Sequence, residues 1–229
     1  MAGIESLKVF IRGASGLRDC LMSDTAGGTI LSKGLSELVA EGYPDAPPVE
    51  TAFEVCDGVA SFRRALERDF NGQTLAPRFA PNIVTLSLEA DLRGSSGEWG
   101  PAEVDRFEDD LLAVVRLIKA DLGSHVIVVN ASSIDPASNV TGFQDASHEP
   151  LALRAHRYNL ATMHVSYEEG ISIVDADRLV AELGAAEVVQ SFLEYTEPGA
   201  RAICAELARV IGDYGFLDNR PVLPQMGRS

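Results

Sequence analysis

The stretch Leu7-Lys8-Val9-Phe10-Ile11-Arg12-Gly13-Ala14-Ser15 decides the fold class of this 229-residue chain. Its apolar and β-branched residues predict a strand over Leu7–Arg12 that is buried on both faces, as in a parallel sheet. The strand stops at a Gly-x-Ser turn, which would place the hydroxyl group of Ser15 at the carboxyl edge of the sheet. Open α/β sheets bind their ligands at that edge. Ser15 is therefore either part of a functional site or an ordinary helix cap.

Four further runs rich in valine and isoleucine predict strands of the same kind: Glu50–Cys56, Ile83–Leu88, His125–Asn130 and Ile171–Asp175. Between and after the strands, apolar residues recur at spacings of three and four, which predicts amphipathic helices. These are Thr29–Ala40, Val59–Asp69, Glu103–Leu122, Leu151–Glu168 and Gly199–Ile211. Strand and helix alternate along the whole chain, and this pattern predicts an α/β fold with a parallel sheet and helices on both faces.

The composition narrows the range of partners. The chain has 34 acidic and 19 basic residues, a net charge of −15, which disfavours nucleic acid and anionic membranes as partners. Its three cysteines are far apart and form no Cys-x-x-Cys pair, so neither a disulfide framework nor a zinc site is expected. The sequence shows no signal peptide and no apolar run of membrane-spanning length. We expect a cytoplasmic protein without metal or cofactor that binds a small-molecule substrate or a protein partner; homo-oligomerisation stays open.

Four blocks of the chain resemble the conserved blocks of the SGNH (GDSL-like) hydrolases, in an order that covers nearly all of residues 7–211. Gly13-Ala14-Ser15 resembles the Gly-Asp-Ser block, with Ser15 at the nucleophile position. Cys56-Asp57-Gly58 resembles the block whose glycine N–H helps to form the oxyanion hole. Glu89-Ala90-Asp91-Leu92 stands where the family has Gly-x-Asn-Asp. The stretch Glu194–Gly199 stands where the family has its histidine-containing block, before the last helix.

The resemblance implies a three-layer α/β/α fold with a flavodoxin-like parallel sheet of about five strands. It implies a single domain over residues 1–211, and we expect an irregular C-terminal tail over 212–229. The implied activity is that of a serine esterase or acyltransferase acting on a small ester or acyl substrate. In this reading Ser15 is the nucleophile and the N–H of Gly58 stabilises the oxyanion.

Three positions depart from the family pattern: Glu194 stands at the histidine position, Ser191 at the associated aspartate and Asp91 at the oxyanion-hole asparagine. A serine without an adjacent base is a poor nucleophile, and glutamate is a weak base at neutral pH unless burial raises its pKa. An ionised carboxylate at Asp91 accepts hydrogen bonds but cannot donate them. Losing one oxyanion donor costs roughly 3–4 kcal/mol, so only a protonated Asp91 could serve.

Two loops hold further candidate residues. His148 lies in the loop over residues 131–150 and is a candidate replacement base for Ser15. A shifted alignment cannot restore the family histidine, because no histidine follows His164. His125 and His156 lie in a predicted strand and helix and are not well placed. Trp99, in the loop over residues 93–100, would either wall the substrate site or pack at a helix start.

Asp57, Glu89, Asp91 and Glu194 all fall at or beyond the carboxyl ends of predicted strands. These carboxylates would either stay solvated or gather on one pocket rim with Ser15, where they suit a cationic ligand or acid/base chemistry. Besides an active serine hydrolase, two hypotheses remain: a non-catalytic pseudoenzyme that binds a ligand or a protein, and carboxylate-based chemistry on a cationic substrate. Loss of activity in Ser15→Ala or in Glu194→Gln would separate them.

Overall fold

The computed structural model describes residues 5–22, 34–55, 57–67, 74–93, 100–133, 151–191 and 194–218. Its core is a five-stranded parallel sheet of order β2-β1-β3-β4-β5. The strands are β1 (Leu7–Gly13), β2 (Val49–Val55), β3 (Ile83–Ser87), β4 (His125–Val129) and β5 (Ser172–Val174). This order is that of flavodoxin-like doubly wound sheets, so the predicted fold class is confirmed.

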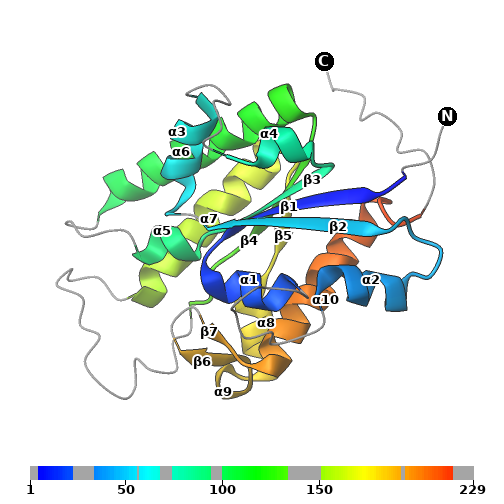
Figure 1. Cartoon of the computed structure of the whole chain (residues 1–229). Coiled ribbons are helices and arrows are strands. Elements are labelled where there is room, and N and C mark those ends of the chain that lie inside the picture. The colour runs from blue at the N-terminus through cyan, green and yellow to red at the C-terminus, as the bar shows by residue number, and fades with distance from the viewer. Residues whose placement is uncertain are drawn as a thin grey trace.

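Helices cover both faces of the sheet and make three layers (Figure 1). One face packs against α1 (Ser15–Leu21), α2 (Leu35–Gly42), α8 (Ala176–Leu183) and α10 (Glu197–Asp213). The other face packs against α3 (Val59–Glu67), α6 (Pro101–Leu117) and α7 (Leu151–Glu169). Strand residues supply side chains to both apolar cores in alternation: Val9 and Ile11 face the first, and Phe10 faces the second. This alternation explains why the central strands carry apolar residues on both of their faces.

Short elements complete the fold: α4 (Ala76–Phe79), α5 (Glu89–Arg93), the π-helical turn η1 (Ile118–Leu122), α9 (Ala185–Val188), β6 (Val189–Ser191) and β7 (Glu194–Tyr195). β6 and β7 form a small antiparallel pair apart from the main sheet. The five predicted strands agree with the structure to within about one residue at each end, but α1, α8 and this pair were not predicted. Leu217, in the segment expected to be irregular, is buried in the core with α10.

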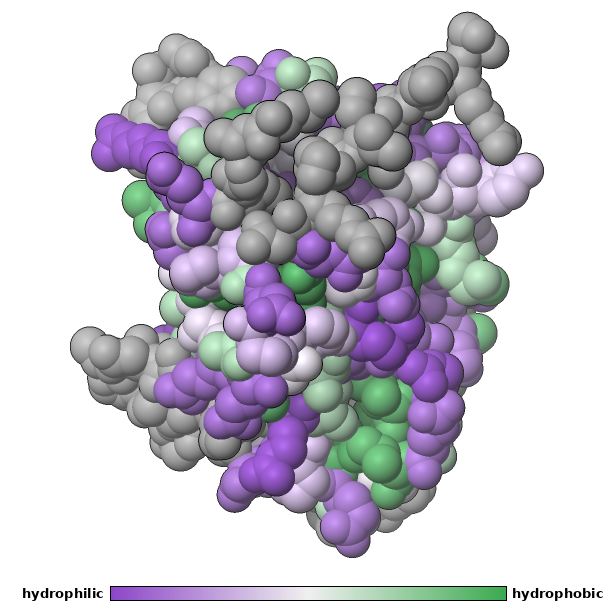
Figure 2. All heavy atoms as spheres, turned by 90° about the vertical axis from the view of Figure 1, so that its right-hand side faces the viewer, coloured by the Kyte–Doolittle hydropathy of each residue, from purple (hydrophilic) through white to green (hydrophobic). Residues whose placement is uncertain are grey.

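The protein surface is rich in charge, in keeping with the composition. Figure 2 shows mostly hydrophilic side chains on one face, with a smaller hydrophobic area near its lower edge. Within the described ranges, no helix combines the length and the apolar character needed to cross a bilayer.

The partly buried ring of His125 makes the stability of the fold sensitive to acid. The ring lies at the start of β4, with Nε2 2.7 Å from Oγ of Ser172 and its centroid 4.4 Å from that of Tyr214. Burial, aided by the charge of Lys119, lowers the pKa of His125 to about 4. The unfolded chain, with a histidine pKa of about 6.5, therefore takes up this proton first as the pH falls.

We expect a loss of roughly 2 kcal/mol in the free energy of unfolding as the pH falls from about 6.5 to about 4, a value reduced for the partial exposure of the ring. Urea unfolding at several pH values checks this for the wild type beside His125→Gln, which stays neutral while its amide can still reach Ser172. Other titrating groups act equally in both proteins. Parallel curves for the two proteins would contradict the prediction.

Candidate active site

The ends of three strands meet at the carboxyl edge of the sheet. Gly13, the last residue of β1, pairs with Val55, the last residue of β2. On its other side β1 pairs with β3, with Arg12 opposite Leu86. A Cβ atom at Gly13 would lie only 2.8 Å from Cβ of Ser87, so glycine permits this close approach. The loops that carry residues 14–15, 57–58 and 88–91 therefore begin side by side.

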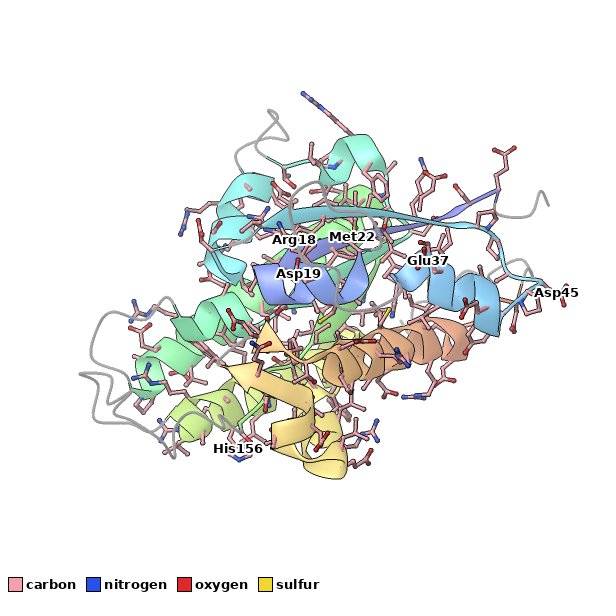
Figure 3. All side chains as sticks on the ribbon, turned by 60° about the horizontal axis from the view of Figure 1, so that its bottom comes forward. Arg18, Asp19, Met22, Glu37, Asp45 and His156 are labelled. Atoms are coloured by element: carbon pink, nitrogen blue, oxygen red, sulfur yellow. The ribbon has the colours of Figure 1, made fainter. Side chains whose placement is uncertain are left out.

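Ser15 is the first residue of α1 and follows the end of β1 after one extended residue, Ala14. Its backbone lies at the carboxyl edge of the sheet, while its side chain is outside the described residues. Further along α1, Nε of Arg18 donates to Oδ1 of Asp19 at 2.9 Å; Figure 3 labels both. Arg18 and Asp19 are the charged residues of α1, and they pair with each other.

The structure brings Gly58 and Asp91 into direct contact, although they lie 33 positions apart in the sequence. Gly58 has φ +108°, a conformation that favours glycine, and a Cβ atom there would lie 2.6 Å from Oδ1 of Asp91. The same oxygen accepts a hydrogen bond of 2.8 Å from the N–H of Val59, the first residue of α3. The turn after β2 and the start of α5 are thereby joined through the Asp91 carboxyl group.

Asp91 has an unusual electrostatic environment. Oδ2 is enclosed and has no hydrogen-bond partner among the described residues. Burial raises the pKa of Asp91 to about 7, and the charge of Asp110 adds to the rise. The backbone N–H groups of Val59 and of Asp91 itself oppose this rise but do not cancel it. Near neutral pH the carboxyl group is therefore protonated in much of the population, and in that state it can donate a hydrogen bond.

Glu89 is fully buried, which corrects its expected place on an exposed rim. The reason is that α5 begins directly after β3, which turns Glu89 inward, where the hydroxyl group of Tyr195 in β7 donates to Oε1. Burial first, and then the charge of Glu89, raise the pKa of Tyr195, so the phenol keeps the proton that it donates. Glu89 and Tyr195 thus form a buried pair that connects α5 with β7.

The expected rim of carboxylates is not seen in the described part of the chain. Glu89 faces Tyr195 and Asp91 faces Gly58, while Asp57 and Glu194 are exposed. No three His, Cys, Asp or Glu side chains of the described residues are grouped so that they could hold a metal ion.

Three residues named from the sequence lie where their side chains are not described. His148 and Trp99 fall in segments outside the described residues, and for Ser191 only the backbone in β6 is described. Of the residues named for the site, the structure therefore joins Gly58 with Asp91 and leaves the base of Ser15 unassigned.

A second polar group at the carboxyl edge was not predicted from the sequence. Nδ2 of Asn130 donates to Oδ1 of Asp175 at 2.8 Å, and Oδ1 of Asp177 accepts from both N and Oγ of Ser133 at 2.7 Å. Asp175 also caps α8 by accepting from the N–H of Arg178. Asn130 and Asp175 each follow a strand directly, which is the signal that could have revealed them. These bonds join the ends of β4 and β5 and support the edge of the sheet.

Comparison with known proteins supports the fold but gives no sequence relative: no family model and no curated protein sequence matches the chain. Among solved structures, a lipase/acylhydrolase from Enterococcus faecalis is similar, with TM-score 0.67 and 16% identity over 94% of this chain and 99% of that one. An acetylxylan esterase from Geobacillus stearothermophilus has TM-score 0.62 and 14% identity, covering 96% and 97% of the two chains. A member of the lipolytic G-D-S-L family from Veillonella parvula has TM-score 0.60 and 14% identity, covering 90% and 98%. The chain therefore has the fold of the SGNH (GDSL-like) hydrolases.

Proposed function

We propose that this protein is a serine hydrolase or acyltransferase that acts on a small ester or acyl substrate, with Ser15 as its nucleophile. The observation that carries the proposal is the contact of Asp91 with Gly58 beside the end of β1, where Ser15 begins α1. These positions correspond to the nucleophile and to two oxyanion donors in the resemblance found from the sequence. The activities of the structural neighbours, a lipase/acylhydrolase and an acetylxylan esterase, are consistent with ester substrates.

In the proposed reaction, Oγ of Ser15 attacks the carbonyl carbon of the substrate while its proton passes to a base. The N–H of Gly58 donates to the oxygen atom on which negative charge develops, and the O–H of protonated Asp91 does so once substrate has displaced the groups that enclose Oδ2 in the free protein. The alcohol then leaves with a proton, and water or a second alcohol releases the acyl group from Ser15. The protonated state of Asp91 replaces the amide donor that an asparagine would supply.

The base has two candidates. Glu194 lies in β7, which packs against α1, and its side chain is exposed. His148 remains the candidate predicted from the sequence. The esterase proposal requires one of them to reach Ser15, whereas the mechanism at the oxyanion is the same for both.

Labelling with a fluorophosphonate tests the proposal, in parallel with hydrolysis of p-nitrophenyl acetate. We expect the wild type to be labelled and to hydrolyse the ester, and Ser15→Ala to lose both activities because the nucleophile is gone. Ser36→Ala, in α2 and away from the carboxyl edge, is the matched control and should behave like the wild type. Absence of labelling and of turnover in all three proteins would contradict the proposal.

That contrary outcome would favour the second candidate function, a non-catalytic protein that binds a ligand at the same edge of the sheet. The lack of any histidine after His164 is the observation in its favour. For this function Ser15→Ala would leave ligand binding unchanged.

A further inference from the structure

Helix α7 carries large apolar side chains on the side that faces away from its core. Leu160, Met163 and Tyr167 are 65%, 61% and 91% exposed, although Tyr158, Ala161 and Val165 of the same helix are buried. The buried side packs chiefly on α6, α5 and β5. The low amphipathic character of this helix, apolar on two opposite sides, indicates a surface that is suited to a partner.

Four side chains form the outer stripe of α7: His156, Leu160, Met163 and Tyr167. Their spacings of four, three and four residues match the alternating positions of a coiled-coil seam. Figure 3 shows His156 at the lower margin of the molecule, pointing away from its body. The spacing is symmetric about the middle of the stripe. A second copy of the helix in the opposite direction would therefore place Leu160 against Met163 and His156 against Tyr167, each contact twice.

Charges on one flank of the stripe fit the same arrangement. Arg157 lies near one end of this flank and Glu168 near the other, with His164 between them. His164 is held by Glu108, at 2.5 Å from Nδ1, and lies 3.5 Å from Glu168. In an antiparallel pair, the same flanks of the two helices face each other, so Arg157 of each copy would meet Glu168 of the other. In a parallel pair the same flanks would lie on opposite sides of the seam, so Arg157 and Glu168 of the two copies would not meet.

We propose that the outer stripe of α7 is a self-association surface, through which two copies of the chain pair with their α7 helices antiparallel. Four side chains on a single helix bury less than the roughly 800 Å² per partner that stable interfaces need. The dimer is therefore weak, with a Kd on the order of tens of micromolar. This inference does not depend on the proposed catalytic function.

Sedimentation velocity over a concentration series tests the pairing. The wild type should shift from monomer to dimer between about 5 and 500 μM, a range that brackets the expected Kd. Leu160→Lys should remain monomeric throughout, with unchanged thermal stability because the side chain is exposed. Leu183→Lys is the control: it makes the same leucine-to-lysine change at a half-exposed residue of α8, outside the outer stripe, and should dimerise like the wild type. A wild type that stays monomeric at every concentration, or a dimer that Leu160→Lys leaves intact, would overturn the proposal.

Two further sets of variants test the direction of the helices. Residues 156 and 167 are eleven apart, so in an antiparallel pair the two copies of either position lie about 16 Å apart along the seam. Under mild oxidation, a mixture of His156→Cys and Tyr167→Cys should cross-link, whereas each variant alone should stay at the wild-type background. Cross-linking within each variant alone would show a parallel pair and refute this arrangement. Likewise, Glu168→Arg should weaken the dimer and Arg157→Glu combined with Glu168→Arg should restore it.

Discussion

Replacing Asp91 by asparagine is expected to stabilise the protein by as much as about 4 kcal/mol near pH 8, and by little near pH 4. The pKa of Asp91 is raised to about 7 in the folded protein, against about 3.9 in an unfolded chain. The folded state therefore binds the proton more tightly, and this contribution to stability is complete below about pH 4 and is lost as the pH rises to about 7. Asparagine has no charge to bury, so the variant does not suffer this loss.

The same change is expected to raise ester hydrolysis by about tenfold or more near pH 8. At one pH unit above its pKa, only about a tenth of Asp91 is protonated and able to donate to an oxyanion. An asparagine can keep its Oδ1 on the N–H of Val59 and offer its amide N–H at every pH. The advantage of the variant over the wild type should disappear near pH 5, where Asp91 carries its proton.

Both effects are measured by urea unfolding and by kcat/KM for p-nitrophenyl acetate across pH 5–9, for the wild type, Asp91→Asn and Asp91→Ala. The alanine variant is the control, since it removes the charge and the hydrogen-bond donor together. It should show only part of the gain in stability seen in Asp91→Asn, and it should be poorly active at every pH. A ratio of Asp91→Asn to wild-type activity that is constant with pH would show that protonation of Asp91 plays no part in catalysis.

Substitution of Gly199 by alanine is expected to cost about 3 kcal/mol or more of folding free energy. Gly199 lies in the first turn of α10, where a Cβ atom would overlap the carbonyl oxygen of Val188 and lie 2.9 Å from the carbonyl carbon. These atoms are backbone and cannot turn aside as a side chain can. The N–H of Gly199 also donates to Oγ1 of Thr196, the helix cap, and movement of α10 would strain this bond.

Thermal and urea unfolding of Gly199→Ala beside Gly42→Ala checks this prediction. Gly42 ends α2, and a Cβ atom added there would have no neighbouring atom within 4 Å, so its alanine variant should be as stable as the wild type or slightly more stable. Equal stability of the two variants would contradict the close packing of α10 against Val188.

The sheet could be predicted from the sequence because each strand is a short run that contains valine or isoleucine and is rich in apolar residues. The runs at Leu7–Gly13 and Ile83–Ser87 lie between the two cores, so most residues in them are apolar and the pattern is clear. By contrast, α1 has only seven residues and follows β1 after a single residue, too short for helical periodicity to show. The pair β6–β7 has two or three residues in each strand and is held by tertiary contacts rather than by its own pattern.

The proximity of Gly58 and Asp91 was predictable from the sequence, but the contacts of the residues around them were not. Order and spacing of the blocks indicated that residues 15, 58 and 91 would lie near one another, and Gly58 does contact Asp91. The buried pair of Glu89 and Tyr195 could not be foreseen, because a glutamate and a tyrosine far apart in the chain carry no shared pattern. The high pKa of Asp91 likewise depends on how completely the surrounding elements enclose it, which is a property of packing.

The hydrogen bond from Tyr195 to Glu89 also affects the order in which parts of the protein can fold during synthesis. It spans 106 residues, and the first 91 residues already contain Ser15, Gly58 and Asp91. A nascent chain that ends before Tyr195 therefore carries these candidate catalytic groups but lacks the hydroxyl group that satisfies the buried Glu89. Because burying a carboxylate without its donor is costly, this edge of the sheet closes only after the C-terminal part of the chain has left the ribosome.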